Sequence, residues 1–114
     1  MRNTTTVALL SLAVAGCGMS VESAREDLTI KGCNFYQQCM QIGSGKTYAT
    51  YDDCKTQLRA YWLSALPSAD CSKGIDGSKY QVCTSGIAGA QCGNALDFLS
   101  VLQKCSKQQL CLTQ

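Results

Sequence analysis

Cysteine content is the feature that most restricts how this chain can fold. The sequence has nine cysteines in 114 residues. An odd number suits a fully disulfide-bonded protein only if one cysteine has another role, and Cys17 lies apart from the rest, near the N-terminus. We therefore expect the other eight to form four structural disulfides, as in small exported domains. These eight are Cys33, Cys39, Cys54, Cys71, Cys83, Cys92, Cys105 and Cys111.

The N-terminus resembles a bacterial lipoprotein signal. A basic start at Arg2 precedes an apolar run over residues 7–15, which is shorter than the about 20 residues that a membrane-spanning helix needs. The run ends in "VAGC" at residues 14–17, which resembles a lipobox, where small residues precede a cysteine that is acylated. The prediction is a signal peptide over 1–16 and lipidation of Cys17; the alternative is an ordinary signal peptide with Cys17 as an unmodified thiol.

Lipidation of Cys17 would determine where the protein is located and how its mature chain is organised. Two or three acyl chains on Cys17 give stable membrane anchoring, whereas a single chain binds only marginally. Gly18 stands where an inner-membrane lipoprotein often has aspartate, which favours the outer membrane, facing the periplasm or the cell surface. Residues 17–28 are polar without strong apolar periodicity and are interpreted as a tether that can continue into the first helix. A disulfide-rich domain over 29–114 follows.

Charge gives no sign of a polyanionic partner. Removal of residues 1–16 leaves 98 residues with nine basic and eight acidic side chains, and no block of like charge occurs. We therefore expect neither nucleic-acid nor nucleotide binding.

Apolar periodicity predicts an all-α fold, a small bundle of about four short helices held by the disulfides. The expected helices cover 29–42, 51–66, 77–88 and 94–105. Thr50, Asp76 and Asn94 are the predicted N-caps of the last three, and Pro67 ends the second. The second helix should place these side chains on one inward face: Tyr51, Cys54, Leu58, Tyr61, Trp62 and Ala65. In the fourth helix we expect these side chains to be buried: Ala95, Phe98, Leu99, Leu102 and Cys105.

Helix geometry limits the pairing of cysteines. Cys33–Cys39, Cys54–Cys71 and Cys92–Cys105 are each separated by too much helix to meet. Cys39–Cys54 is the preferred pair because it flanks a single turn, and Cys71–Cys83 is the second choice. Cys33 would then join a cysteine near the C-terminus. The remaining assignments stay open, since eight cysteines allow 105 connectivities.

The stretch "GSGKT" at residues 43–47 resembles the end of a nucleotide-binding P-loop. A P-loop requires an additional glycine where this chain has Met40, and it follows a buried strand of a parallel sheet. Neither condition is met, so the segment is interpreted as a hairpin loop, with Gly43 just beyond a helix end.

No catalytic set is evident, and the prediction is that the protein is not an enzyme. The chain has no histidine and no Cys-x-x-Cys pair, which argues against the usual nucleophile–histidine arrangements, zinc sites and other cofactors. Asp52 and Asp53 suit first-turn positions of a helix better than an acid/base pair. Two further groups are candidates for contacts with a ligand, although core or loop positions explain them more simply: Tyr61 with Trp62, and the residues in and near the loop, Lys46, Tyr48 and Tyr51.

Four stretches resemble a known family. "CNFYQQC", "IGSGKTYATYDDC", "QVCTSGIAGAQCGNALDFL" and "VLQKCSKQQLC" are similar to small eight-cysteine bacterial lipoproteins of unknown function, some labelled natural product biosynthesis lipoprotein. The similarity covers most of residues 29–112 and the lipobox. It implies an exported, anchored, disulfide-linked domain, and it supplies no catalytic residues.

Three functions are considered. An enzyme accessory to secondary metabolism requires convergent polar side chains in a cleft, and the sequence offers no obvious set, so two functions are favoured. The first is a non-enzymatic, lipid-anchored envelope protein that presents its helical module to an unknown protein or cell-envelope partner, with a possible link to natural product biosynthesis. The second is a small binding module or carrier for an apolar molecule. The second requires a continuous apolar pocket between the helices, and the first does not.

Overall fold

The protein is all-α in a computed structural model that describes residues 19–113, apart from the side chains of residues 95, 96 and 98. The predicted signal peptide and the predicted lipidation site, Cys17, lie outside the described residues. Within residues 19–113 there are isolated β-bridges but no strands, which confirms the predicted fold class. The helices are α2 (Val21–Gln38), α3 (Tyr51–Ala65), α4 (Gly77–Gly89), α5 (Ala95–Lys104) and α6 (Lys107–Leu110), the last of which was not predicted.

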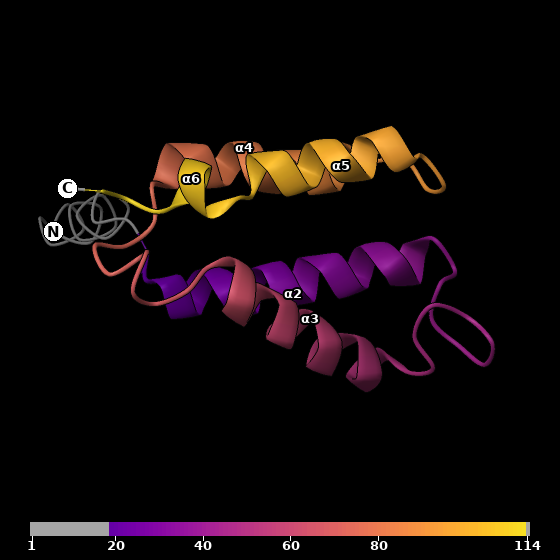
Figure 1. Ribbon diagram of the computed structural model, residues 1–114. Coiled ribbons are helices and arrows are strands. Elements are labelled where there is room, and N and C mark those ends of the chain that lie inside the picture. Colours follow the sequence, from indigo (N-terminus) through magenta and orange to yellow (C-terminus); the bar gives the residue numbers. More distant parts are fainter. Residues whose placement is uncertain (1–18, 114) are drawn as a thin grey trace, which may run out of the picture.

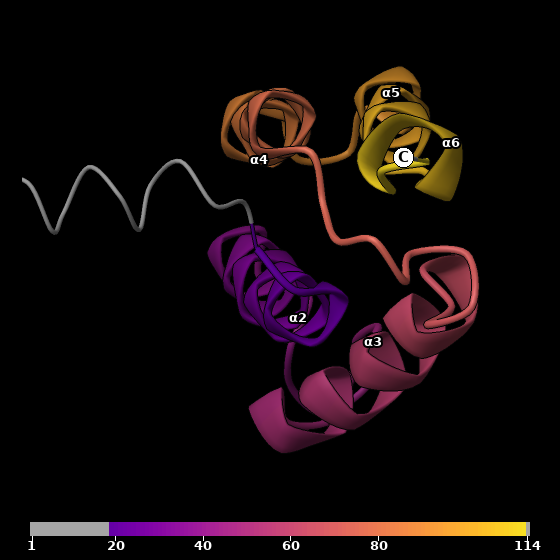
Figure 2. The same ribbon diagram turned by 90° about the vertical axis from the view of Figure 1, so that its left-hand side faces the viewer.

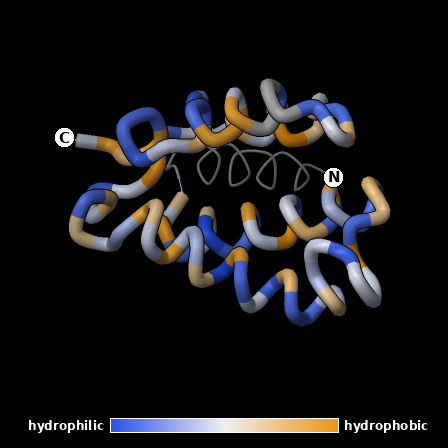
Figure 3. The backbone as a smooth tube through the Cα atoms, turned by 45° about the vertical axis from the view of Figure 1, so that its right-hand side comes forward, coloured by the Kyte–Doolittle hydropathy of each residue, from blue (hydrophilic) through white to orange (hydrophobic). Residues whose placement is uncertain are grey.

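The four longer helices form two hairpins stacked on each other. Figure 1 shows α4 and α5 in one layer and α2 and α3 in the other, and Figure 2 shows the same two layers end on. The layers meet mainly where α2 packs on α4, and there the Tyr80 hydroxyl donates a hydrogen bond to the Asp27 carboxylate. Hydrophobic positions lie largely where the two layers face each other (Figure 3). The principal buried side chains are Val21, Ala24, Leu28, Trp62, Leu66, Ile75, Tyr80, Val101 and Leu110.

Side-chain caps place the starts of three helices where the sequence predicted them. The Thr50 hydroxyl accepts a hydrogen bond from the Asp53 backbone N–H at 3.0 Å. Asp76 accepts in the same way from the N–H of Lys79 at 3.1 Å, and Asn94 accepts from the N–H of Asp97 at 3.3 Å. Each cap satisfies a backbone donor that has no partner within its helix.

The first described helix begins earlier than predicted. It starts at Val21, with the Ser20 hydroxyl accepting from the N–H of Ser23, so most of the expected tether is helical. Val21, Ala24 and Leu28 are spaced three and four residues apart and are buried, so they belong to the core of the domain. This apolar stripe was missed because glutamate, arginine and aspartate separate its members.

Arg25, on the same face of α2, joins the two helices of the first hairpin. Its side chain is only 9% exposed, and its Nε donates to the carbonyl oxygen of Leu66 at 2.9 Å. A second nitrogen, Nη2, donates to the Ser68 hydroxyl at 2.8 Å. Leu66 is the C-cap of α3, where carbonyl groups lack helical partners and the helix dipole favours a cation. The guanidinium therefore completes the end of α3.

Four disulfides cross-link the fold, and none of the preferred pairings was correct. Cys33 bonds Cys54 and Cys83 bonds Cys105, so that each hairpin contains one cross-link. The other two connect more distant segments: Cys39–Cys92 and Cys71–Cys111. The expected Cys39–Cys54, Cys71–Cys83 and Cys33–C-terminal pairs are wrong, whereas the three exclusions based on helix length are confirmed.

The register of the first hairpin explains the main error. α2 ends at Gln38, and residues 39–50 form a compact loop in which the N–H of Gly43 donates to the Tyr48 carbonyl at 2.8 Å. The loop is therefore longer than a simple turn. The Tyr51 hydroxyl donates to Asn34 at 2.7 Å, which places the start of α3 beside residues 33 and 34. At this register Cys33 lies opposite Cys54, and Cys39 lies beyond α3.

The second hairpin differs from two further predictions, which concern the partner of Cys83 and the burial of Leu99. Cys83 is in the middle of α4 and faces α5, where Cys105 follows the last turn, so its partner is Cys105 and not Cys71. This cross-link also sets which face of α5 is inward. Val101, one turn before Cys105, is buried, whereas Leu99 is 55% exposed and was wrongly predicted to be buried. Leu102 is half-buried, and the Ala95 and Phe98 side chains lie outside the described residues.

The GSGKT segment is a surface loop. It lies between two helices of an all-α fold, so the structural setting of a P-loop is missing from the described chain. Gly43 is not the residue beyond the helix end. Met40 takes that place, with a φ of 58°, because α2 ends at Gln38, four residues before the predicted end at residue 42.

One end of the molecule is joined by backbone hydrogen bonds around Ile75. The N–H of Ile75 donates to the Met19 carbonyl at 3.0 Å, and the N–H of Leu112 donates to the Gly74 carbonyl at 2.9 Å. Cys71–Cys111 cross-links the same segments. The linker, the start of α2 and the C-terminus are therefore held together at this end.

The position of Arg25 gives a stability prediction. Arg25→Met keeps the aliphatic bulk but leaves the buried Leu66 carbonyl without its donor, so we expect a loss of about 2–3 kcal/mol in the free energy of unfolding, measured by denaturant titration of the oxidised protein. Arg59→Met is the matched control, since Arg59 forms an exposed ion pair with Glu26, and we expect little change. Equal effects of the two substitutions would contradict the capping role of Arg25.

Candidate ligand pocket

A pocket of about 330 Å³ lies between the two hairpins. All four longer helices contribute to its wall, and Tyr48 reaches it from the 39–50 loop. Its volume is near the lower end of the about 300–1,000 Å³ typical of small-molecule sites. The lining residues are Leu28, Gly32, Phe35, Tyr36, Tyr48, Gln57, Leu58, Tyr61, Trp62, Ile87, Ala90, Val101 and Leu102. We call this the interhelical pocket.

Aromatic rings form much of the pocket wall, in two groups. On one side Tyr36 meets Tyr48 edge to face, with ring centroids 5.1 Å apart. On the other side Tyr61 and Trp62 meet in the same way at 4.9 Å. Edge-to-face pairs of this kind are favourable beyond the area that they bury, and they hold the rings in fixed orientations. The wall is therefore ordered, although it encloses unfilled space.

α2 and α3 approach each other closely at Gly32 and Leu58, in the wall of the pocket. A Cβ atom placed on Gly32 would come within 2.7 Å of Leu58 Cδ1, a distance that real Cβ contacts do not show. Glycine at position 32 thus allows Leu58 to occupy its position. Any larger residue at position 32 would require Leu58 to move. Since both residues line the pocket, its volume depends on this contact.

The polar groups of the pocket are uncharged. None of its described lining residues is Lys, Arg, Asp or Glu; the lining side chains with polar groups are the tyrosines, Gln57 and Trp62 with its indole N–H. Burial, reinforced by the neighbouring Tyr48, raises the pKa of the Tyr36 hydroxyl above its ordinary value. Tyr36 is therefore a neutral phenol at physiological pH and is able to donate a hydrogen bond.

A second hollow adjoins the pocket at Phe35 and Tyr36, which line both. It has a volume of about 380 Å³, and Cys39 and Cys92, which form a disulfide, are part of its wall. The other lining residues are Gln41, Thr47, Gln91, Gly93 and Asn94. We call this hollow the polar recess. Its lining in the described chain also lacks charged side chains.

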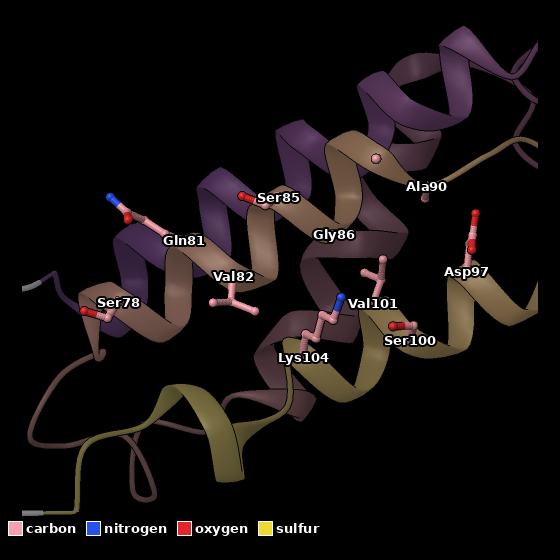
Figure 4. A pocket seen from close by; sticks show the side chains of 11 residues that line it. Ser78, Gln81, Val82, Ser85, Gly86, Ala90, Asp97, Ser100, Val101 and Lys104 are labelled. Atoms are coloured by element: carbon pink, nitrogen blue, oxygen red, sulfur yellow. The ribbon is translucent and has the colours of Figure 1, made fainter.

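A larger groove of about 520 Å³ lies between α4 and α5 (Figure 4). Val82 from α4 and Val101 and Lys104 from α5 extend into it, and most of its other lining residues are small or carry hydroxyl groups. Its only carboxylate, on Asp97, already accepts a hydrogen bond from the N–H of Gln91 at 2.9 Å and braces the preceding loop. The groove is more open to solvent and more polar than the interhelical pocket, so it suits an apolar ligand less well.

The structure brings together some of the predicted contact residues. Tyr61 and Trp62 both line the pocket, although Trp62 is 6% exposed and belongs to the core. Tyr48 also lines the pocket. Tyr51 instead donates a hydrogen bond to Asn34, and Lys46 is on the exposed loop, so Lys46, Tyr48 and Tyr51 do not form one patch. Sequence periodicity marked Leu58 as inward-facing. It gave no sign that the space beside Leu58 is open.

Other kinds of site find no support within the described residues. No group of three Cys, Asp or Glu side chains in this part of the chain is arranged to hold a metal ion. Asp53 accepts a hydrogen bond from the N–H of Ala49 and binds the side chain of Gln57, which fits the expected role at the start of α3. None of the helices between residues 19 and 113 is long and apolar enough to cross a membrane.

The fold and the pocket define a small, all-helical protein in which four disulfides cross-link two hairpins around an apolar hollow. Residues 33–113 match the family described as "Family of unknown function (DUF6184)", and this protein belongs to that family. The resemblance to a cysteine-rich family of unknown function is thus confirmed. No curated protein and no solved structure matches the chain.

The disulfides differ in accessibility, which gives a chemical prediction. Cys92 is exposed and Cys39 half-buried, whereas the cysteines of the other three pairs are buried. Under native conditions, limiting phosphine reductant followed by alkylation and peptide mass spectrometry should label Cys39 and Cys92 first, because disulfide reduction requires access to sulfur. Earlier labelling of Cys33–Cys54 or Cys83–Cys105 would contradict this order.

Proposed function

We propose that this protein is a non-enzymatic binding module of the cell envelope that holds an apolar molecule in the interhelical pocket. The observation that carries the proposal is the pocket itself: aromatic and aliphatic side chains from four helices surround about 330 Å³ of open space. Small-molecule sites are commonly hollows of this kind, largely apolar and lined by a few polar groups. This observation favours the carrier function over presentation of a helical surface to a partner.

The cross-links support a preformed site. Cys33–Cys54 fixes α2 against α3, Cys83–Cys105 fixes α4 against α5, and Cys39–Cys92 connects the hairpins beside the polar recess. A pocket held open in the free protein reduces the ordering cost of binding. The bound molecule would therefore enter without a rearrangement of the fold.

The lipobox-like sequence and the signal-like N-terminus support a further part of the proposal, in which acylated Cys17 anchors this module to the outer membrane. A membrane-proximal carrier is in a position to receive poorly soluble molecules. The label natural product biosynthesis lipoprotein, carried by some proteins that the chain resembles, fits a role in holding a product of such a pathway. The proposal assigns the protein no catalytic step.

Binding is tested with the neutral fluorescent probe N-phenyl-1-naphthylamine and the oxidised, purified protein. We expect probe fluorescence to rise on binding and the affinity to fall several-fold in Gly32→Ala, because the new methyl group and the displaced Leu58 both reduce the pocket volume. Gly89→Ala is the matched control, since nothing lies within 4 Å of the added methyl group there.

Thermal unfolding of both glycine variants shows whether they remain folded. Absence of probe uptake by the folded parent protein would overturn the carrier function. Equal affinity in Gly32→Ala and Gly89→Ala would show that the probe binds outside the interhelical pocket.

The anchor is tested by mass spectrometry of the protein isolated from membranes. We expect a mature chain that begins at Cys17 and carries a diacylglyceryl group, with residues 1–16 removed. Cys17→Ser should abolish the lipid mass and release the protein from the membrane fraction. An unmodified Cys17 in the parent chain would remove the lipoprotein assignment and leave the pocket proposal intact.

A further inference from the structure

The interhelical pocket and the polar recess differ in chemistry but share part of their wall. Phe35 and Tyr36 line both hollows, so that a molecule extending from one to the other passes these two rings. The pocket side is aromatic and aliphatic. The recess side offers the polar side chains of Gln41 and Thr47 from one loop and Gln91 from another. The site thus has an apolar part and a hydrogen-bonding part.

Charge is missing from both parts of the described lining. A carboxylate or ammonium group on a ligand would leave water in this site without meeting an opposite charge, which is unfavourable. A hydroxyl, carbonyl or amide group meets matching partners among the glutamine and threonine side chains of the recess. The Thr47 hydroxyl already donates to the Gln41 side-chain oxygen at 2.8 Å, which shows that these groups are within hydrogen-bonding reach of each other.

The shape of the apolar part favours a ring system. Aromatic side chains from α2, α3 and the 39–50 loop surround it, and they are fixed by edge-to-face contacts. Rings of a ligand continue this packing better than a flexible alkyl chain, which loses more conformational freedom on binding.

We propose that the ligand is a neutral amphiphile, with an aromatic body in the interhelical pocket and an uncharged hydrogen-bonding end in the polar recess beside Cys39–Cys92. This inference rests on the proposed carrier function and adds the chemical class of the ligand. It excludes fatty acids and other charged amphiphiles as the preferred ligands.

Three naphthalene derivatives of similar size test the charge requirement at pH 7. They are 2-naphthamide, which is neutral, 2-naphthoate, which is an anion, and 2-naphthylmethylammonium, which is a cation. Each is titrated against protein loaded with N-phenyl-1-naphthylamine, and displacement of the probe is measured. We expect 2-naphthamide to bind at least about tenfold more tightly than either ion, since only the ions lose hydration without an opposite charge in return.

A variant pair tests whether the recess holds the polar end. Gln91→Arg places a cation on the recess wall and should improve 2-naphthoate binding several-fold relative to 2-naphthamide. Gln108→Arg makes the same change on the exposed surface of α6 and should leave the ratio unaltered. The paired control removes the effect of overall charge.

The outcomes separate the two proposals. Probe uptake with equal affinity for all three derivatives, or with preference for an ion, overturns the neutral-ligand inference and leaves the carrier function standing. An unchanged ratio in Gln91→Arg overturns the placement of the polar end. If the folded parent protein takes up no probe, the carrier function itself fails.

Discussion

The disulfide pattern is the constraint on which the rest of this structure depends. One bond lies within each hairpin, at Cys33–Cys54 and Cys83–Cys105, and the other two connect distant segments near opposite ends of the fold. A hydrophobic core alone gives marginal stability to a domain of this size, and each native cross-link in a small exported domain contributes roughly 2–4 kcal/mol. Because disulfides hold the fold near both ends, the two hairpins do not need to pack tightly against each other along their whole length. Space between the layers is compatible with a stable fold for this reason.

Features set by local interactions were predictable from the sequence, and features set by the register between helices were not. α3 and α4 begin where Thr50 and Asp76 lead the sequence to expect, because an N-cap acts within three residues. The pairing of Cys33 with Cys54 depends instead on how far α3 slides along α2, which the compact 39–50 loop and the Tyr51–Asn34 hydrogen bond decide. Arg25 shows the same limit. Its partner Leu66 is 41 residues away in the chain, so the sequence suggested a polar tether where the fold has a buried cap.

From the sequence, the carrier function could be stated only as a requirement for an apolar pocket between the helices. The position of that pocket could not be predicted. Leu58, Tyr61 and Trp62 were assigned to one inward face of α3, and that face does border the pocket. An apolar stripe has the same pattern whether its neighbours fill the space beside it or leave it open. The difference here depends on details such as Gly32, where the missing side chain lets Leu58 approach α2. Whether a pocket stays open depends on several packing distances between helices together, and no single sequence motif determines all of them.

The Cys39–Cys92 disulfide makes the candidate site depend on the redox conditions of the compartment in which the protein is expected to work. Cys39 and Cys92 lie outside the helices, and their bond forms part of the wall of the polar recess. It is also the cross-link with the most exposed cysteines in the described chain, so a reducing environment would open it before the buried ones. Opening this bond would release α2 from the α4–α5 loop at the recess while Cys33–Cys54 and Cys83–Cys105 still held each hairpin together. An intact recess therefore requires oxidising conditions, which is the environment that the lipobox and the eight cysteines independently predict for this chain.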